Sequence, residues 1–385
     1  METSGVPAFL EAIGASNASA YESSGQCSEV PQYRFNPVSG VWSLHMATRD
    51  GKPYDYKLPP TPKVSTHLRP EILPEKDGFD PFDLSKCHLT PPEKAYALDP
   101  RDSSKKMVRV FDNKFAIFDN SRDLSACSGS VGLYPAMTAI GVSEVVVEHW
   151  KFGMCAALMD TEEIAILWRV IRDRANVLSK IPDARWVNVA ENHGSKAGGS
   201  LQHPHAQVMA LPFLPTDQSR LFDLARKFWK AESRNVFESL VDDLGDGLPG
   251  AGRKIYENAH CVSFVPWALE REFEFWVVPR IAGAAFKDAS DEVVDAVADV
   301  LRHSLRMLYV TLDDPDYNIL VRTGPISEER EEAEQWYRWH IVVLPSITEW
   351  AGVKAFGGFV LAPCLPEEMA AKLRASKDLP LSEAR

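Results

Sequence analysis

The chain has 385 residues, of which 45% are hydrophobic and 25% charged, a composition typical of a soluble enzyme with one large or two smaller domains. Asp and Glu outnumber Lys and Arg by 54 to 42, and the net charge of -12 opposes attraction to a phosphate backbone, so we expect no nucleic-acid partner. A small anionic substrate is still compatible with this charge, because a few local Arg, Lys and backbone N–H groups can bind it. The sequence contains no apolar stretch long enough for a transmembrane helix, so we expect no membrane partner either.

The beginning of the chain and its cysteines favour a cytoplasmic protein. The six cysteines form no close pair and no dense framework, which is typical of reduced thiols. Residues 1–26 are rich in Ser, Ala and Gly but lack the basic start and apolar core of a signal peptide, so we interpret residues 1–32 as a flexible leader. Residues 58–92 are rich in proline, which predicts an extended segment rather than a helix.

From residue 108 onward the first half shows apolar runs typical of strands around a single helix. Asp160 is predicted to start the helix, because it precedes Thr161-Glu162-Glu163 as in a capping box and apolar residues then recur at helical spacing. The strands are predicted at residues 108–118, 144–150, 185–190 and 207–211.

The second half repeats this order of elements. Its strands are predicted at residues 261–267, 273–278, 317–322 and 336–344, with a helix after Ser290 whose buried stripe contains Val293, Val294, Val297, Leu301, Leu305 and Leu308. A repeat of about 130 residues predicts an α+β fold of two tandem duplicated units, each with an antiparallel sheet and one main helix. We place the units at residues 33–215 and 216–385.

The segment from Glu191 to Gln207 carries the strongest chemical signal. Its glycines, Gly194, Gly198 and Gly199, let the backbone turn and bring N–H groups close to a phosphate, and Ser200 adds a hydroxyl donor. The strand that follows is expected to present His203, His205 and Gln207 on one face, since side chains alternate along a strand.

An imidazole is a competent nucleophile toward phosphorus at neutral pH, because a large fraction of it is uncharged there. His205 is therefore the candidate nucleophile and Gln207 a donor to a phosphoryl oxygen. A bare His-x-His on a strand is more often polar surface or a metal pair, but the glycine loop directly upstream favours catalysis. When the two units are aligned on Pro212 and Pro345, His205 falls opposite Arg338 and Gln207 opposite His340, so only the first unit keeps the full motif.

Residues Asn192 to Gln207 resemble the active-site segment of the galactose-1-phosphate uridylyltransferase family, within the histidine-triad superfamily, and are most similar to its ADP-glucose phosphorylase branch. The asparagine thirteen residues before the nucleophilic histidine in that family corresponds to Asn192. The resemblance implies two histidine-triad-like units, a homodimer and a covalent histidine–nucleotide intermediate.

Site roles follow from this resemblance residue by residue. It makes His205 the nucleophile with His203 beside it, Gln207 a phosphoryl-binding amide, and Asn192, Gly198, Gly199 and Ser200 the phosphate loop. It places Asn113 and Phe115 near the base and ribose, and it aligns Arg49 and Lys52 with two family arginines near substrate phosphates. Lys52 is a departure that keeps the charge but loses the bidentate fork.

Zinc is the cofactor that the resemblance raises, and here the sequence departs from the family. Many members bind zinc through Cys-x-x-Cys and two histidines, whereas this chain has Asp80, Asp83, His149 and His203 at those positions. Cys87 and His88 nearby are alternative ligands. Carboxylates in place of thiolates weaken a zinc site, so we expect low metal content. A second family metal site is expected to be absent, because only His340 of its histidine pair is present.

The resemblance implies transfer of a nucleoside monophosphate from a nucleoside diphosphate sugar to a sugar 1-phosphate or inorganic phosphate. Two alternatives stay open: a dinucleoside polyphosphate phosphorylase or hydrolase of the same superfamily, and a nucleotide-binding protein without catalysis. The presence of both His205 and Gln207 argues against the last alternative.

Overall fold

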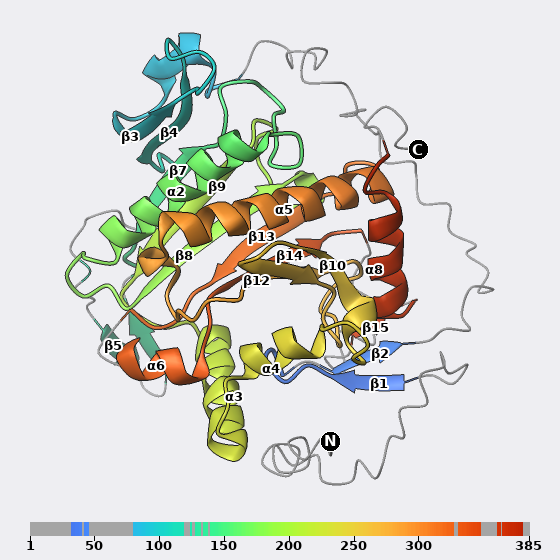
Figure 1. Cartoon of the computed structure of the whole chain (residues 1–385). Coiled ribbons are helices and arrows are strands. Elements are labelled where there is room, and N and C mark those ends of the chain that lie inside the picture. The colour runs from blue at the N-terminus through green and yellow to red at the C-terminus, as the bar shows by residue number, and fades with distance from the viewer. Residues whose placement is uncertain are drawn as a thin grey trace, which may run out of the picture.

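The computed structural model describes residues 32–40, 42–45, 80–118, 124, 128–131, 134–137, 139–326, 330–347, 360–362 and 364–379. Its centre is a ten-stranded sheet in the order β10-β11-β12-β14-β13-β8-β9-β7-β4-β3, with antiparallel pairing between all neighbours (Figure 1). The bounds are β3 (Glu93–Leu98), β4 (Lys106–Asp112), β7 (Val142–Val147), β8 (Trp186–His193), β9 (His205–Leu211), β10 (Lys254–Glu257), β11 (Cys261–Phe264), β12 (Phe275–Pro279), β13 (Tyr317–Arg322) and β14 (His340–Pro345). The mixed helix and sheet class and the antiparallel pairing agree with the prediction.

Two long helices, α2 (Thr161–Leu178) and α5 (Asp291–Leu312), lie side by side across one face of the sheet (Figure 1). Asp160 and Glu163 form the predicted capping box of α2, and the Ser290 hydroxyl caps α5. The apolar stripes of both helices pack on the sheet in one continuous core. Both helix predictions are confirmed.

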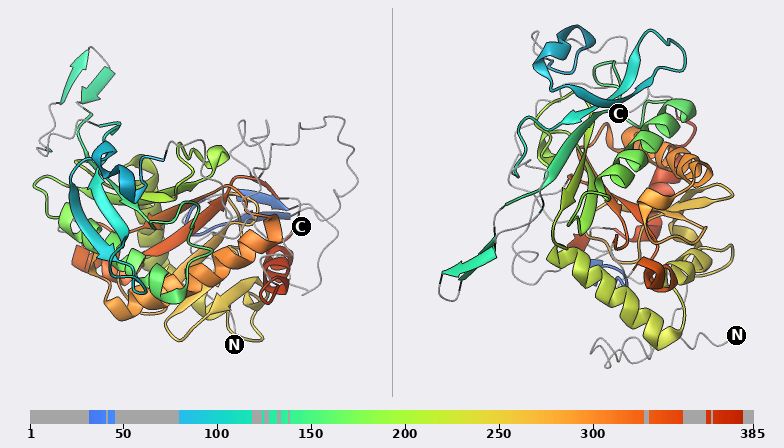
Figure 2. Two further views of the ribbon diagram at one scale, coloured as in Figure 1. Left: turned by 90° about the horizontal axis from the view of Figure 1, so that it is seen from above. Right: turned by 90° about the vertical axis from the view of Figure 1, so that its left-hand side faces the viewer.

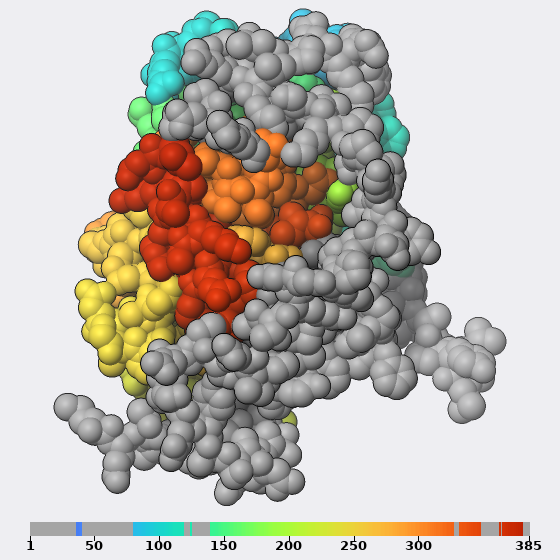
Figure 3. Space-filling model, turned by 90° about the vertical axis from the view of Figure 1, so that its right-hand side faces the viewer, coloured from blue at the N-terminus to red at the C-terminus, as the bar shows by residue number. Residues whose placement is uncertain are grey.

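The second half of the sheet is covered on its other face by α3 (Thr216–Glu232), α4 (Val236–Asp243) and α6 (Arg330–Trp336), which enclose a separate apolar cluster. The sequence patterns did not predict these helices. The C-terminal helix α8 (Pro366–Ala375) lies against α5 (Figure 3). The candidate site residues His205 and Gln207 lie on the face of β9 opposite α2.

Within the described part of the chain, five short strands lie outside the main sheet. Strand β15 (Val360–Ala362) pairs in parallel with β2 (Trp42–His45), which pairs with β1 (Gln32–Phe35). Strands β5 (Ser128–Val131) and β6 (Tyr134–Met137) form a hairpin that extends away from the rest of the molecule (Figure 2). Among the helices described, none is long and apolar enough to cross a membrane.

Some predicted boundaries are wrong. The strand expected to reach residue 118 ends at Asp112, because the Asn113 side-chain oxygen accepts the Phe115 N–H and forms a turn. The strand expected from Trp336 begins only at His340, since Trp336 ends α6. Within the proline-rich segment, Leu84–Leu89 forms a short 3-10 helix.

Candidate active site

Strand β9 presents the predicted nucleophile at its first residue. It lies between β7 and β8, with His205 opposite Val147 and Ala206 opposite Glu191. Ala206 and the residues that alternate with it are buried beneath the helices, so His205 and Gln207 face the other side of the sheet. These two side chains therefore share one face, as predicted.

The ring of His205 is held by its own backbone. Its Nδ1 lies 2.9 Å from the carbonyl oxygen of His203, which requires an N–H at Nδ1 and leaves the lone pair on Nε2. The ring of Phe82 packs against it with the centroids 5.3 Å apart. Burial lowers the pKa of His205, and the charge of His203 lowers it further, while the bond to the His203 carbonyl acts in the opposite direction. The lowered pKa favours the uncharged imidazole at neutral pH, the form that a nucleophile requires.

His203 is fixed from both sides. Its Nδ1 lies 2.7 Å from a carboxylate oxygen of Asp80, and its Nε2 lies 2.7 Å from the backbone oxygen of His149. Each ring nitrogen thus faces an oxygen. His203 precedes β9, so these two bonds, rather than strand alternation, set its place. They also position the carbonyl that holds His205.

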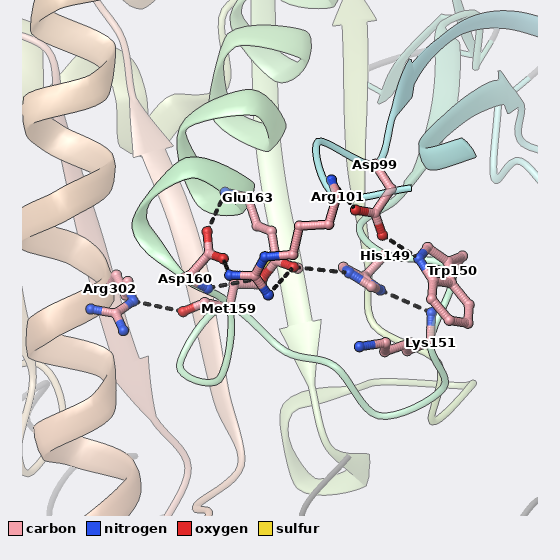
Figure 4. A network of polar contacts seen from close by, with 9 residues as sticks. All are labelled: Asp99, Arg101, His149, Trp150, Lys151, Met159, Asp160, Glu163 and Arg302. Atoms are coloured by element: carbon pink, nitrogen blue, oxygen red, sulfur yellow. Dashed lines mark hydrogen bonds and ion pairs between the residues drawn. The ribbon is translucent and has the colours of Figure 1, made fainter. Parts of the chain in front are cut away.

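A polar network supports the His149 end of this arrangement (Figure 4). The ring of His149 accepts the Lys151 N–H at Nδ1, and its Nε2 lies 3.6 Å from a carboxylate oxygen of Glu163. Glu163 belongs to the capping box of α2 with Asp160, which pairs with Arg101. The His149 contact lowers the pKa of Glu163, against the opposing effect of burial. The start of α2 is thereby linked to the backbone that holds His203.

The four candidate metal ligands do not converge. Asp80 contacts His203, but Asp83 instead accepts the N–H and hydroxyl of Ser85 and caps the 3-10 helix. The ring of His149 faces Glu163 rather than His203. Within the described part of the chain, no three His, Cys, Asp or Glu residues are grouped so that they could hold a metal ion. The alternative ligand Cys87 contacts the guanidinium of Arg109 at 3.1 Å. The residues at this position therefore do not fit zinc.

The glycine-rich loop follows β8 beside His205. Gly194 and Gly198 have φ of 83° and 88°, values that other residues rarely adopt. A side chain at Gly199 would come within 2.8 Å of the backbone oxygens of Asn192 and Gly194. Strands β8 and β9 are antiparallel, and Glu191 lies opposite Ala206. Asn192, the next residue of β8, therefore lies beside His205. Ser200 is exposed at the end of the loop. The predicted loop residues and the nucleophile thus lie together.

Asn113 lies on the same face, further along the sheet. Its N–H donates to Ser143, the partner of Met209 in β9, and its side chain reaches the Ser143 hydroxyl at 3.3 Å. Phe115 is 84% exposed. Arg49 and Lys52 lie outside the described residues.

Sequence reasoning missed two residues of the second half that touch the loop. Asp316 accepts the N–H of Lys196, and Asn318 donates to Asn192 and to the Ala197 carbonyl. They approach because β13 pairs with β8, with Asn318 directly opposite Asn192. Strand β13 was predicted, but no signal within one sequence identified its neighbour.

The chain is similar to known proteins over most of its length. The family model for the N-terminal domain of galactose-1-phosphate uridyl transferase matches residues 23–215. An ADP-glucose phosphorylase of Arabidopsis thaliana is 23% identical over 347 residues, which cover 89% of this chain and 92% of that protein. A galactose-1-phosphate uridylyltransferase of Haemophilus influenzae is 25% identical over 331 residues, 85% of this chain and 87% of its own.

Solved structures show the same fold. The crystal structure of an Arabidopsis thaliana ADP-glucose phosphorylase with bound ADP-glucose superimposes with a TM-score of 0.74 at 21% identity, covering 90% of this chain and 98% of that one. A uridylyltransferase structure superimposes with a TM-score of 0.65 at 18% identity, covering 90% of this chain and 98% of that one.

Proposed function

Because the chain belongs to the galactose-1-phosphate uridylyltransferase family, we propose that it is a nucleotidyltransferase acting through a covalent intermediate on His205. The donor is a nucleoside diphosphate sugar, and the acceptor is a sugar 1-phosphate or inorganic phosphate. The names of the relatives, which include uridylyltransferases and an ADP-glucose phosphorylase, support this reaction class.

One observation carries the proposal: His205 donates its Nδ1–H to the His203 carbonyl and so keeps the Nε2 lone pair beside the glycine loop. In the first step Nε2 attacks the α-phosphorus, and the bond to the bridging oxygen breaks, releasing sugar 1-phosphate with that electron pair. In the second step an acceptor phosphate oxygen attacks the same phosphorus, and the phosphorus–nitrogen bond breaks, returning the lone pair to Nε2. The two steps balance without a net proton.

The surrounding residues stabilise the charge of the transferred group. Gln207, on the same face as His205, donates to a phosphoryl oxygen. The amide of Asn192, the loop N–H groups of Gly198 and Gly199, and the Ser200 hydroxyl bind the phosphates. Asn113 and Phe115 bind the nucleoside, and Arg49 and Lys52 complete the phosphate site. No step passes through a metal, and His203 with Asp80 supports the nucleophile instead.

The strand order supports the division into two duplicated units, residues 33–215 and 216–385. From the centre outward, the sheet runs β8-β9-β7-β4-β3 on one side and β13-β14-β12-β11-β10 on the other, and each side has one long helix between its third and fourth strands in chain order. Residues 1–32 are the leader outside both units. A homodimer and a cytoplasmic location stay predictions of the sequence.

Trapping the intermediate tests the function. Protein is mixed with ADP-glucose or UDP-glucose without acceptor, quenched, and measured by mass spectrometry. Wild type is expected to gain one nucleoside monophosphate on the peptide that contains His205, and His205→Ala to gain none. An adduct on another residue, or normal turnover by His205→Ala, would show that the mechanism is wrong. With the adduct in hand, adding inorganic phosphate, a sugar 1-phosphate or neither identifies the acceptor, including water.

A further inference from the structure

The glycine loop beside His205 is held mainly from the second half of the chain. Within the loop, Gly199 donates its N–H to Gly194 and Gly198 donates to Ser195. The contacts beyond the loop go to residues 314–318, the turn between α5 and β13 and the start of that strand. The loop that binds phosphate in the proposed function therefore depends on a segment more than a hundred residues away in sequence.

Asn318 is the central contact. One hydrogen of its amide goes to the side-chain oxygen of Asn192 at 2.7 Å, and the other goes to the Ala197 carbonyl at 2.8 Å. Asn318 and Asn192 are opposite each other in β13 and β8, and His205 stands on the far side of Asn192 in β9. The three side chains thus form one row across neighbouring strands.

The contact with Asn318 decides which end of the Asn192 amide faces the loop. An amide has an acceptor oxygen and a donor nitrogen, and hydrogen bonding sets its orientation. Because the Asn192 oxygen accepts from Asn318, the nitrogen is left to face the loop, where it lies 4.0 Å from the side-chain position at Gly198. A phosphate in the loop would then meet an N–H donor rather than a carbonyl oxygen, which would repel it.

Neighbouring residues of the same turn hold the rest of the loop. Asp316 accepts the N–H of Lys196 and fills the space that a side chain at Gly194 would need. Asp314 lies 2.9 Å from the ring of His193, which stacks on Tyr317. These contacts restrain the beginning of the loop, so that Asn318 acts on a backbone that is already held there.

We propose that Asn318 is a positioning residue for nucleotidyl transfer, which turns the Asn192 amide nitrogen toward the phosphate site and anchors the loop at Ala197. The inference rests on the proposed function of the loop and His205. It gives the second half of the chain a direct part in the reaction, although that half lacks the complete motif. Preorganised donors that point at developing charge lower the barrier of such a reaction.

Two substitutions separate orientation from packing. Asn318→Ala removes both donors and should slow adduct formation about 10- to 100-fold at saturating nucleotide sugar. Asn318→Asp keeps the size but presents oxygens to Asn192 and to Ala197, so the Asn192 amide should flip its oxygen toward the phosphate. We therefore expect Asn318→Asp to be slower than Asn318→Ala, whereas a packing role predicts the reverse.

A double-mutant cycle shows whether Asn318 acts through Asn192. The rate constant of adduct formation is measured for both single alanine variants and for the double variant, with the nucleotide sugar that labels wild type. If the inference is correct, adding Asn318→Ala to Asn192→Ala slows adduct formation by a clearly smaller factor than Asn318→Ala does in wild type, because only the contact with Ala197 remains to be lost. Additive losses would overturn it, because they would mean that the two residues act separately.

Asn258 offers a matched control. Its side-chain amide also donates twice, to the Ala296 carbonyl at 2.9 Å and to Asp299 at 3.0 Å, but at α5, away from the loop. Asn258→Ala should lower the melting temperature and leave the rate constant per folded molecule unchanged. The inference is overturned if Asn318→Ala behaves in the same way while His205→Ala still abolishes the adduct. If His205→Ala is labelled like wild type, or if wild type is not labelled at all, the proposed function itself fails.

Discussion

His205 and His340 lie in different halves of the sheet and make the same contact with the backbone, but they differ in exposure. Each begins a strand, β9 or β14, and the Nδ1 of each faces the carbonyl two residues earlier, at 2.9 and 3.0 Å. His340 is 1% exposed and lies beneath the rings of Phe237 and Trp276, and burial lowers its pKa to about 3. His205 is only half-buried and stands beside the glycine loop. The ring-to-carbonyl bond therefore sets the tautomer in both places, and exposure distinguishes the proposed nucleophile from the buried histidine.

The largest expected difference comes from substituting each histidine. His205→Ala should abolish the nucleotide adduct with little change in melting temperature, because a half-buried ring is lost but no packed core. His340→Leu should do the opposite. The leucine side chain still fills the space between the rings of Phe237 and Trp276, but the Arg338 carbonyl loses its donor. We therefore expect the free energy of unfolding to fall by about 1 to 3 kcal/mol. Adduct formation should stay near the wild-type rate.

Thermal unfolding and quenched mass spectrometry on the same preparations check this pair. Loss of labelling in folded His340→Leu would show that the second histidine takes part in the reaction. Unimpaired labelling of His205→Ala would show that His205 is no more important for the reaction than His340.

The parts of the fold and of the candidate site that depend on local sequence signals could be predicted from the sequence. The capping residues Asp160 and Ser290 and the apolar spacing after them located α2 and α5. Strand β13 was predicted with its observed bounds, Tyr317–Arg322. The glycines directly before His205 predicted a loop next to the nucleophile, and the structure places them there.

What could not be predicted depends on contacts between distant segments or lacks a local signal. Helix α3 starts after Pro215 without a side-chain cap, so no start signal preceded it. The proximity of Asn318 to Asn192 follows from the pairing of β13 with β8, which a single sequence does not state. The carboxylate of Asp80 was considered only as a metal ligand, whereas its partner is the ring of His203.

A second prediction concerns the pair formed by Asp80 and His203. Burial raises the pKa of Asp80, but the hydrogen bond and charge of His203 outweigh burial and lower it below its usual value. Asp80→Asn weakens this contact and should slow adduct formation about tenfold, the effect of losing about 1.4 kcal/mol of positioning.

Asp83→Asn is the matched control, because Asp83 caps a 3-10 helix and does not bond to His203. It should leave the rate unchanged. We also expect chelators to leave the wild-type rate unaltered. A full equivalent of zinc on elemental analysis, removed together with activity by a chelator, would contradict this account and make Asp80 and His203 ligands to test.

The smallest expected effect concerns two carboxyl groups on the helix-covered face of the sheet, on the opposite side of β9 from His205. Glu148 and Glu191 are buried there on either side of β9, and neither carboxylate oxygen of Glu148 has a hydrogen-bond partner among the residues described. Burial, and then repulsion from Glu191, raises the pKa of Glu148. Burial raises the pKa of Glu191 to about 7, although the charge of His193 acts against it.

The sign of the pH dependence follows from these shifts. The unfolded chain releases the Glu191 proton near pH 4.5, whereas the folded chain keeps it to about pH 7. The folded state therefore binds more protons between these values, and the free energy of unfolding should decrease as pH rises through that window. Glu191→Gln cannot ionise, so its melting temperature should exceed that of wild type at pH 8 and approach it at pH 5. Glu162→Gln, at an exposed position on α2, should match wild type at both. If Glu191→Gln is no more stable than wild type at pH 8, the buried carboxyl has a partner that compensates its charge.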